Sequence, residues 1–275
     1  MIRLNTTQQS HADLRDELRR LRGDSSAQSY ASIIVPVNAQ KDLLRVLTLL
    51  SELANYRGDW SIEIILVINN YPADAPPEEI DEYRQLGVHV VEIPKVEHRG
   101  GVALAARIPG IKVAQSERIL LFDADCHIQD PTSLLGWYIQ QLDSGVDLAY
   151  TRVDYFDLPA GLAIKARMFI HHAIRWAKRV LLGIPTSRGS NYAIPRQLIL
   201  DLFAQQRIRY DIHVGPVVKA MRGKVAYSAA RQHVVFTSGR FFSNSWKELF
   251  SYLVWRTGYY LRVKPTKPAS PSVEQ

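Results

Sequence analysis

The sequence predicts an α/β protein with a doubly wound, mostly parallel sheet flanked by helices. Short runs rich in Val and Ile alternate with segments whose apolar residues recur at helical spacing. The runs lack regular polar alternation, which is typical of strands buried on both faces. The four strands of this alternating part are expected at residues 32–37, 62–68, 88–93 and 119–123.

The remaining elements are predicted from the same periodicities. Helices are expected at 10–23, 43–50, 76–86, 102–114, 131–142, 162–182, 197–204 and 211–223. Further extended segments are expected at 146–153, 192–195, 224–227 and 233–237.

The composition is that of an ordinary globular chain with excess positive charge. Of its 275 residues 47% are hydrophobic and 22% charged, and no apolar run approaches the roughly 20 residues that cross a bilayer. The net charge of +7 predicts an anionic partner, and a nucleotide, a nucleic acid and an anionic membrane all meet that condition. The single Cys126 excludes an internal disulfide and favours a reducing compartment, so we expect a cytoplasmic protein.

The run 118–125 carries the chemistry, because its apolar strand leads directly into Asp123-Ala124-Asp125. Side chains two residues apart share one face of a strand. Since ligands bind beyond the carboxyl ends of parallel strands, Asn38 and Asn69 are expected at the same edge. Paired carboxylates repel each other unless a cation lies between them, and Mg²⁺ or Mn²⁺ bridging to a diphosphate satisfies both. The alternative is that the two acids only start a turn or cap the next helix.

Five motifs, in this order and spacing, resemble the family-2 glycosyltransferases, nucleotide-sugar enzymes of the GT-A fold. The resemblance covers about residues 30–240, and each motif alone is weak. The motifs are 32–37, 101–107 followed by 122–125, 189–194, Asp211 with Gly215 and 221–227, and 237–240.

The resemblance implies a glycosyltransferase, specifically a hexosyltransferase, that moves a sugar from a UDP- or GDP-linked donor to a hydroxyl acceptor with inversion. It implies Asp125 and Asp123 as ligands of Mg²⁺ or Mn²⁺, Asp211 as the catalytic base, and Arg107 and Arg240 as cations that close on the diphosphate. The nucleotide-sugar-binding residues that it implies are Pro36, Val37, Asn38, Asn69, Arg107, Asp123, Ala124, Asp125 and Arg240. The acceptor side that it implies comprises Gly189, Ser190 and Asn191, with C-terminal helices beside them.

The sequence departs from the family pattern at three places. Asn38-Ala39-Gln40 replaces Tyr-Asn and an acid, Asn69-Asn70 replaces an Asp pair, and Tyr210 replaces the acid before Asp211. An Asn amide still accepts from a uracil N3–H, but without the charge-assisted part of that bond. A catalytically degenerate nucleotide-binding protein of the same fold therefore stays open as the alternative.

Two other enzyme classes fit the sequence less well. A nucleotidyltransferase is disfavoured because residues 36–40 lack a Gly- and Lys-rich phosphate loop. An Asp-x-Asp phosphatase is disfavoured because such a dyad generally lies near the N-terminus with a Thr following, where this chain has His127.

Three segments are expected along the chain. Residues 1–29 form an N-terminal helix and linker, 30–240 the GT-A catalytic domain, and 241–275 an amphipathic aromatic helix and tail. The basic helix 162–182 and the aromatic residues of 246–264 flank the predicted site and suit peripheral contact with an anionic membrane at its inner face, which would make the acceptor lipid-linked. The alternative is that these aromatic residues belong to the core and cover of the catalytic domain.

Two negative expectations complete the analysis. Nucleic-acid binding is not expected, because the aromatic residues lie away from any RNA or DNA motif. His171 and His172 are expected at the surface, because neighbouring helical residues point about 100° apart and cannot share a metal.

Overall fold

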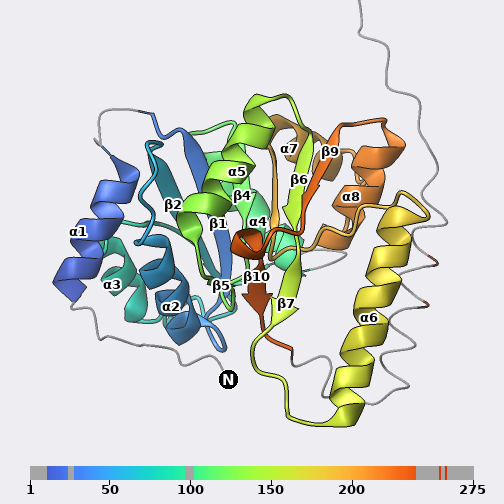
Figure 1. The fold of residues 1–275 in the computed structure, drawn as a ribbon. Helices are drawn as coiled ribbons and strands as arrows, with labels where there is room; N and C mark the ends of the chain where they lie inside the picture. The colour runs from blue at the N-terminus through green and yellow to red at the C-terminus, as the bar shows by residue number, and fades with distance from the viewer. Residues whose placement is uncertain (1–10, 24–27, 97–101, 240–253, 255–257, 259–275) are drawn as a thin grey trace, which may run out of the picture.

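The structure, a computed structural model, describes residues 11–23, 28–96 and 102–239, together with Val254 and Gly258. Within these residues a 7-stranded sheet has the strand order β3-β2-β1-β4-β8-β6-β9 (Figure 1). Strands β1 to β4 are parallel, whereas β8 runs antiparallel to both β4 and β6. The sheet consists of β1 (Ala31–Asn38), β2 (Ile62–Asn69), β3 (His89–Ile93), β4 (Arg118–Leu121), β6 (Leu148–Thr151), β8 (Tyr192–Pro195) and β9 (Val225–Ser228). The predicted fold class is confirmed.

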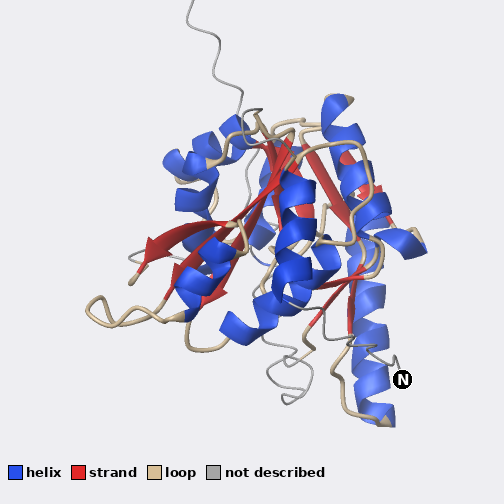
Figure 2. Ribbon diagram, turned by 90° about the vertical axis from the view of Figure 1, so that its left-hand side faces the viewer, coloured by secondary structure: helices blue, strands red, loops and turns tan. Residues whose placement is uncertain are grey.

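Helices cover both faces of this sheet (Figure 2). They are α1 (His11–Arg22), α2 (Leu43–Leu53), α3 (Glu79–Gln85), α4 (Val102–Val113), α5 (Pro131–Asp143), α6 (Leu162–Val180), α7 (Arg196–Ala204) and α8 (Asp211–Ala220). One core joins Ile33 and Val35 to α1, α2, α3 and α5, and the other joins Ile34 to α4, α7 and α8. Because successive side chains of β1 point to opposite faces and both faces are buried, its sequence is a continuous apolar run.

Helix α4 lies very close to the sheet at Gly110. A Cβ atom at this position would lie 2.6 Å from Cγ2 of Val67 and 3.0 Å from Cγ2 of Ile34. The glycine therefore sets the depth of α4, which carries Arg107 toward the carboxyl ends of the strands.

A second, 3-stranded sheet of order β5-β10-β7 was not predicted. It contains β5 (His127–Ile128), β7 (Val153–Tyr155) and β10 (Val235–Thr237), the last preceded by the 3₁₀ helix η1 (Arg231–His233). The predicted strand 146–153 is interrupted at Arg152, because β6 stays in the central sheet and β7 pairs with β10 instead. Strand β10 lies within the extended segment expected at 233–237, and β7 begins at the end of the segment expected at 146–153, whereas the two-residue β5 is too short to show periodicity.

The N-terminal helix belongs to the same body as the sheet, because Leu14, Leu18 and Leu21 of α1 are buried in its core. Among the described residues no helix is both long enough and apolar enough to cross a bilayer. The predicted helix and tail of 241–275 lie outside the described residues, apart from Val254 and Gly258.

Candidate active site

A groove of about 320 Å³ opens where β1, β2 and β4 end. It is lined by Pro36, Asn38, Asp42, Asn69, Val102, Ala103, Ala106, Asp123, Ala124 and Asp125. The structure thus brings six of the residues singled out from the sequence to one hollow at the carboxyl edge of the sheet, where open α/β sheets bind ligands.

Two asparagines form one wall of the groove, and backbone contacts hold their amides in place. Asn69 donates from Nδ2 to the carbonyl oxygens of Val37 at 3.1 Å and Val67 at 3.2 Å. Because both donor positions are used, Oδ1 is the atom that Asn69 can offer to a ligand. Asn38 accepts at Oδ1 from the backbone N–H of Gln40 and from Nδ2 of Asn70, each at 3.1 Å.

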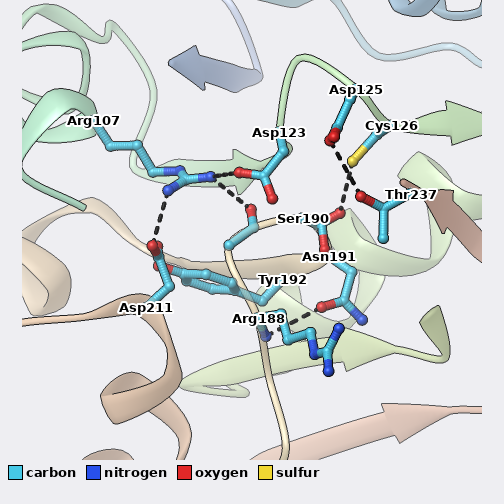
Figure 3. Close-up of polar contacts among 11 residues, drawn as sticks. Arg107, Asp123, Asp125, Cys126, Arg188, Ser190, Asn191, Tyr192, Asp211 and Thr237 are labelled. Atoms are coloured by element: carbon cyan, nitrogen blue, oxygen red, sulfur yellow. Dashed lines mark hydrogen bonds and ion pairs between the residues drawn. The ribbon is translucent and has the colours of Figure 1, made fainter. Parts of the chain in front are cut away.

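Beneath the acidic pair lies a fully buried guanidinium, that of Arg107, which is 0% exposed. Its Nη1 donates to Oδ2 of Asp211 at 2.9 Å, and its Nη2 donates to the carbonyl oxygen of Gly189 at 3.0 Å and to Asp123 (Figure 3). The hydroxyl of Tyr192 donates to the other oxygen of Asp211 at 3.1 Å. One cation therefore links α4, the end of β4, the loop before β8 and the start of α8.

Burial and charge act in opposite directions in this cluster. Burial lowers the pKa of Arg107, but the carboxylates of Asp211 and Asp123 outweigh it, so the net direction is upward and the guanidinium stays charged. Burial raises the pKa of Asp211 above its ordinary value, and Arg107 offsets only part of that rise. Burial also raises the pKa of Tyr192 well above its usual value, with Asp211 adding to the effect, so this phenol remains a donor.

Asp125 has a different partner. Its Oδ1 accepts from the hydroxyl of Thr237 at 3.1 Å, so the end of β10 holds the second acid of the pair (Figure 3). Both carboxylates line the groove, and oxygen donors of this kind are the ligands that Mg²⁺ and Mn²⁺ prefer.

The described residues contain no group of three or more His, Cys, Asp or Glu side chains that could hold a metal ion. A divalent ion at this pair therefore needs further oxygens from a ligand. The donor set fits such an ion, because hard divalent metals are commonly bound by one or two carboxylates together with substrate phosphates.

The side chains of two predicted nucleotide-side residues, Val37 and Arg107, do not line the groove, and the position of a third, Arg240, is not described. The side chain of Val37 is buried in the core on the opposite side of the strand from Asn38. Arg107, expected to close on a diphosphate, lies under the groove because two carboxylates hold it there. Arg240 lies outside the described residues.

The predicted acceptor-side residues are buried as well. Gly189 contributes its carbonyl to Arg107, and Ser190 contributes its carbonyl to the thiol of Cys126 at 3.6 Å. Asn191 donates to the carbonyl of Thr151 and accepts from the backbone N–H of Arg188 at 3.2 Å. These three residues shape the loop before β8 and do not line the groove.

Four lining residues were missed, namely Asp42, Val102, Ala103 and Ala106. Asp42 precedes α2, where an acid is typical of a helix cap, and small residues along α4 are typical of helix packing. A signal was present for Asp42, since it stands two residues after the position where the family pattern expects an acid. Its carboxylate pairs with Arg45 at 3.3 Å at the groove's edge.

A doubly wound sheet with amides and paired acids in one groove at its carboxyl edge defines the class of GT-A glycosyltransferases. The model of glycosyl transferase family 2 matches residues 32–199, and the chain belongs to this family. The resemblance noted in the sequence is thereby confirmed. A comparison with curated proteins finds no match.

Solved structures with a similar fold are also glycosyltransferases. A mannosyltransferase from Pyrobaculum calidifontis, in complex with GDP-Man and Mn²⁺, is 15% identical, with 94% of this chain and 72% of that chain covered at a TM-score of 0.56. Glucosyl-3-phosphoglycerate synthase from Mycobacterium tuberculosis, in complex with Mn²⁺, UDP and phosphoglyceric acid, is 16% identical, with 95% and 84% covered at a TM-score of 0.49.

Proposed function

We propose that this glycosyltransferase transfers a hexose from a UDP- or GDP-linked donor to a hydroxyl acceptor, with inversion at the sugar carbon. The observation that carries the proposal is a single groove with amides on one wall and two carboxylates on the other. Its volume of about 320 Å³ lies in the usual range of small-molecule sites.

The asparagine wall is the proposed nucleotide side. Oδ1 of Asn69 accepts from an N–H of the base, since its Nδ2 is already bonded to the backbone. At the same end of the groove Asp42 accepts from a ribose hydroxyl, and Nδ2 of Asn38 donates to a ribose oxygen, since its Oδ1 already accepts two hydrogen bonds. The small side chains of Ala103 and Ala106 leave room for the diphosphate beside α4.

Asp125 and Asp123 are the proposed ligands of Mg²⁺ or Mn²⁺, together with oxygens of the donor's diphosphate. When bound, the ion neutralises the charge that develops on the departing diphosphate. Arg107 fixes the position of Asp123 from below. The Mn²⁺ and GDP-Man of the similar mannosyltransferase support this assignment.

Asp211 is the proposed catalytic base. The acceptor oxygen bonds to the sugar carbon as the bond from that carbon to the phosphate oxygen breaks, and the hydroxyl proton passes to the Asp211 carboxylate. Attack opposite the leaving group inverts the sugar carbon. A pKa raised by burial makes this carboxylate a stronger proton acceptor, and each of its oxygens keeps a second lone pair beside its present bond.

The proposed acceptor is lipid-linked, and the proposed location is the cytoplasmic face of a membrane. The net charge of +7 and the aromatic, basic residues of 246–264 support this assignment.

A second function, a nucleotide-binding protein without turnover, is favoured by one observation. Asp211 is only 9% exposed, and both of its oxygens are already bonded. In that case Asp211 only positions Arg107.

Calorimetry with UDP and GDP, each with and without Mn²⁺, tests the proposal first, and metal-dependent binding is expected. Transfer or donor hydrolysis is then compared between the wild type, Asp211→Asn and the exposed control Asp81→Asn. If Asp211 is the base, Asp211→Asn lowers the rate by about 10²- to 10⁴-fold and leaves nucleotide affinity within a few-fold. Equal rates reject Asp211 as the base, and a wild type that binds nucleotide without turnover supports the second function.

A further inference from the structure

Helix α6 stands at the side of the molecule (Figure 1). Its large apolar side chains are exposed and several of its polar side chains are buried. A helix on the surface of a globular protein ordinarily buries its apolar stripe and exposes its polar face. In α6 the buried residues are His171, Arg175 and Lys178, which corrects the expectation that His171 is a surface residue. Exposed large apolar side chains on α6 and just after it are Leu162, Phe169, Ile170, Trp176, Val180, Leu181 and Leu182.

The outward residues form one continuous stripe. Leu162, Phe169 and Trp176 follow one another at intervals of seven, with Ala166, Ala173 and Val180 in the intervening turns, so they share one face of the helix. We call these six residues, with Leu181 and Leu182, the outward stripe. Exposed apolar stripes of this length mark sites of contact with another apolar surface.

Polar contacts, by contrast, attach the helix to the rest of the chain. Arg175 donates to the carbonyl of Thr186 at 3.0 Å, and His171 contacts Tyr155 at 3.3 Å and Arg188 at 2.9 Å. The guanidinium of Arg179 lies 3.9 Å from the ring centroid of Tyr227. These contacts fix which face of α6 points outward.

A cavity of about 240 Å³ lies directly beside the outward stripe. It is lined by Arg152, Val153, His172, Arg175, Trp176, Arg179, Tyr227 and Ala229. We call it the arginine pocket. Asp154 is the carboxylate that the structure places next to it, 3.0 Å from Arg152 and 3.8 Å from His172. Among the described residues the pocket is lined by three arginines and has the Asp154 carboxylate beside it, which makes this part of the surface positively charged, and Trp176 belongs to both the pocket and the stripe.

The sign of the charge selects among the surfaces that could cover the stripe. A second copy of the chain would bring a second arginine pocket of the same sign. The segment 241–262 of this chain carries Lys247, Arg256 and Arg262 against a single acid, Glu248, so it too is positively charged. An anionic lipid surface offers apolar chains for the stripe and phosphates for the arginines, which bind phosphate oxygens in pairs.

We propose that the outward stripe and the arginine pocket together dock the protein on an anionic phospholipid membrane, with lipid phosphates in the pocket and acyl chains along the stripe. The helix lies in the plane of the interface and does not cross the bilayer. This inference rests on the proposed membrane location. The surface shares no lining residue with the nucleotide groove, so vesicle binding and nucleotide binding can fail separately.

Vesicle flotation of the full chain tests the proposal. The wild type is expected to float with vesicles of phosphatidylcholine containing about 30 mol % phosphatidylglycerol, several-fold less with phosphatidylcholine alone, and less in about 0.5 M NaCl. Phe169→Glu is expected to lower partitioning at least about tenfold, because it removes a large apolar contact and adds a repelled charge. Leu44→Glu is the matched control, since Leu44 and Phe169 are both 75% exposed.

The pocket has its own pair of variants. Arg152→Gln is expected to lower binding to the anionic vesicles about fivefold, with little effect on neutral vesicles. Arg84→Gln is the control, because both arginines are 47% exposed and paired with carboxylates. Leu181→Glu serves as a second stripe variant, and circular dichroism checks that each variant folds.

Several results would overturn the proposal. These are a wild type that stays at the bottom of the gradient, or a Phe169→Glu chain that floats as the wild type does. A dimer by light scattering that Phe169→Glu splits would assign the stripe to a second copy. A lower melting temperature of Phe169→Glu with unchanged flotation would assign the outward stripe to this chain's own segment 241–262. Binding of soluble glycerol phosphate by the wild type without flotation would assign the arginine pocket to a soluble ligand.

Discussion

In the proposed nucleotide half of the site, residues 31–125, polar side chains at the strand ends line the groove, whereas in the proposed acceptor half, residues 183–211, they are buried and bonded within the protein. Asn38 and Asn69 are held by the backbone and keep an atom for a ligand. Asn191, Tyr192 and Asp211 spend their hydrogen bonds within the protein. The first half offers hydrogen-bonding atoms to a ligand. The second half holds Arg107 through Asp211, and Arg107 in turn positions Asp123 of the first half.

Removing the buried cation should have the largest effect, because Arg107 joins the two halves. Arg107→Met leaves Asp123 and Asp211 without their partner, and a buried ion pair broken in this way costs roughly 3–5 kcal/mol of unfolding free energy. Urea denaturation measures the loss. As a control, Arg84→Gln removes an ion pair at the surface and should change the unfolding free energy by less than about 0.5 kcal/mol.

A double variant separates charge from packing at the same place. Adding Asp211→Asn to Arg107→Met removes one uncompensated carboxylate, so part of the loss should return. If the double variant is less stable by the full sum of the two single changes, the ion pair is not the link between the halves.

The next largest effect is expected at Gly189, where Arg107 approaches the backbone. A Cβ atom there would lie 2.7 Å from Nη2 of Arg107, a fully buried guanidinium that would have to shift against Asp123 and Asp211. Gly189→Ala should cost about 1–3 kcal/mol and also weaken metal-dependent nucleotide binding, because Asp123 moves with the guanidinium.

Gly223→Ala is the matched control for Gly189→Ala, since its Cβ atom would lie 2.7 Å from Cγ1 of Val218, away from the groove. It should lower the melting temperature and leave nucleotide affinity unchanged. Calorimetry of both variants decides whether the effect on binding belongs to Arg107 or to general loss of stability.

A smaller effect is expected from Thr237, the partner of the second acid. Thr237→Val removes the hydrogen bond to Oδ1 of Asp125, so affinity for Mn²⁺ and nucleotide should fall about fivefold, the equivalent of one hydrogen bond of about 1 kcal/mol. Thr132→Val, which removes a hydrogen bond to the backbone of Arg57, should leave this affinity unchanged. An unaltered affinity in Thr237→Val would mean that β10 does not help to hold the metal ligand.

The smallest effect is expected at His127 of β5, in the 3-stranded sheet, and it depends on pH. The hydrogen bond from His127 to Glu52, 2.8 Å long, raises the pKa of the imidazole above its ordinary value. The charged ring therefore stabilises the fold below about pH 6.5, and this contribution is lost as pH rises through the folded-state pKa.

His127→Gln should accordingly lower the unfolding free energy by about 1 kcal/mol near pH 5 and by little near pH 9. Melting temperatures across that range give the comparison, with His89→Gln on the exposed β3 as control. A deficit that is the same at both pH values would assign the effect to lost packing against Phe156.

The nucleotide half could be predicted from the sequence because its signals are local. Each parallel strand is a continuous apolar run that ends in a polar residue, and the carboxyl ends of such strands meet at one edge. This reasoning places Asn38, Asn69, Asp123 and Asp125 at that edge, and all four line the groove. Asp42 was missed because an acid before a helix is equally typical of a cap.

The contacts that support the groove from other parts of the chain could not be predicted, because their partners are distant in sequence. Arg107 and Asp211 are 104 residues apart in the sequence, and Thr237 and Asp125 are 112 residues apart. A short stretch of sequence therefore never contains both members of either pair. Helix α6 shows a further reason, since periodicity marks an apolar face without saying whether that face points inward.

The order in which the ribosome makes this chain gives the link between Thr237 and Asp125 a further consequence. A nascent chain that has emerged only as far as β5 already contains both asparagines and both acids of the groove. It still lacks Asp211, which shares Arg107, and Thr237, which holds Asp125. The proposed metal-binding pair therefore gains its full set of supporting contacts only once β10, the last strand among the described residues, has been made.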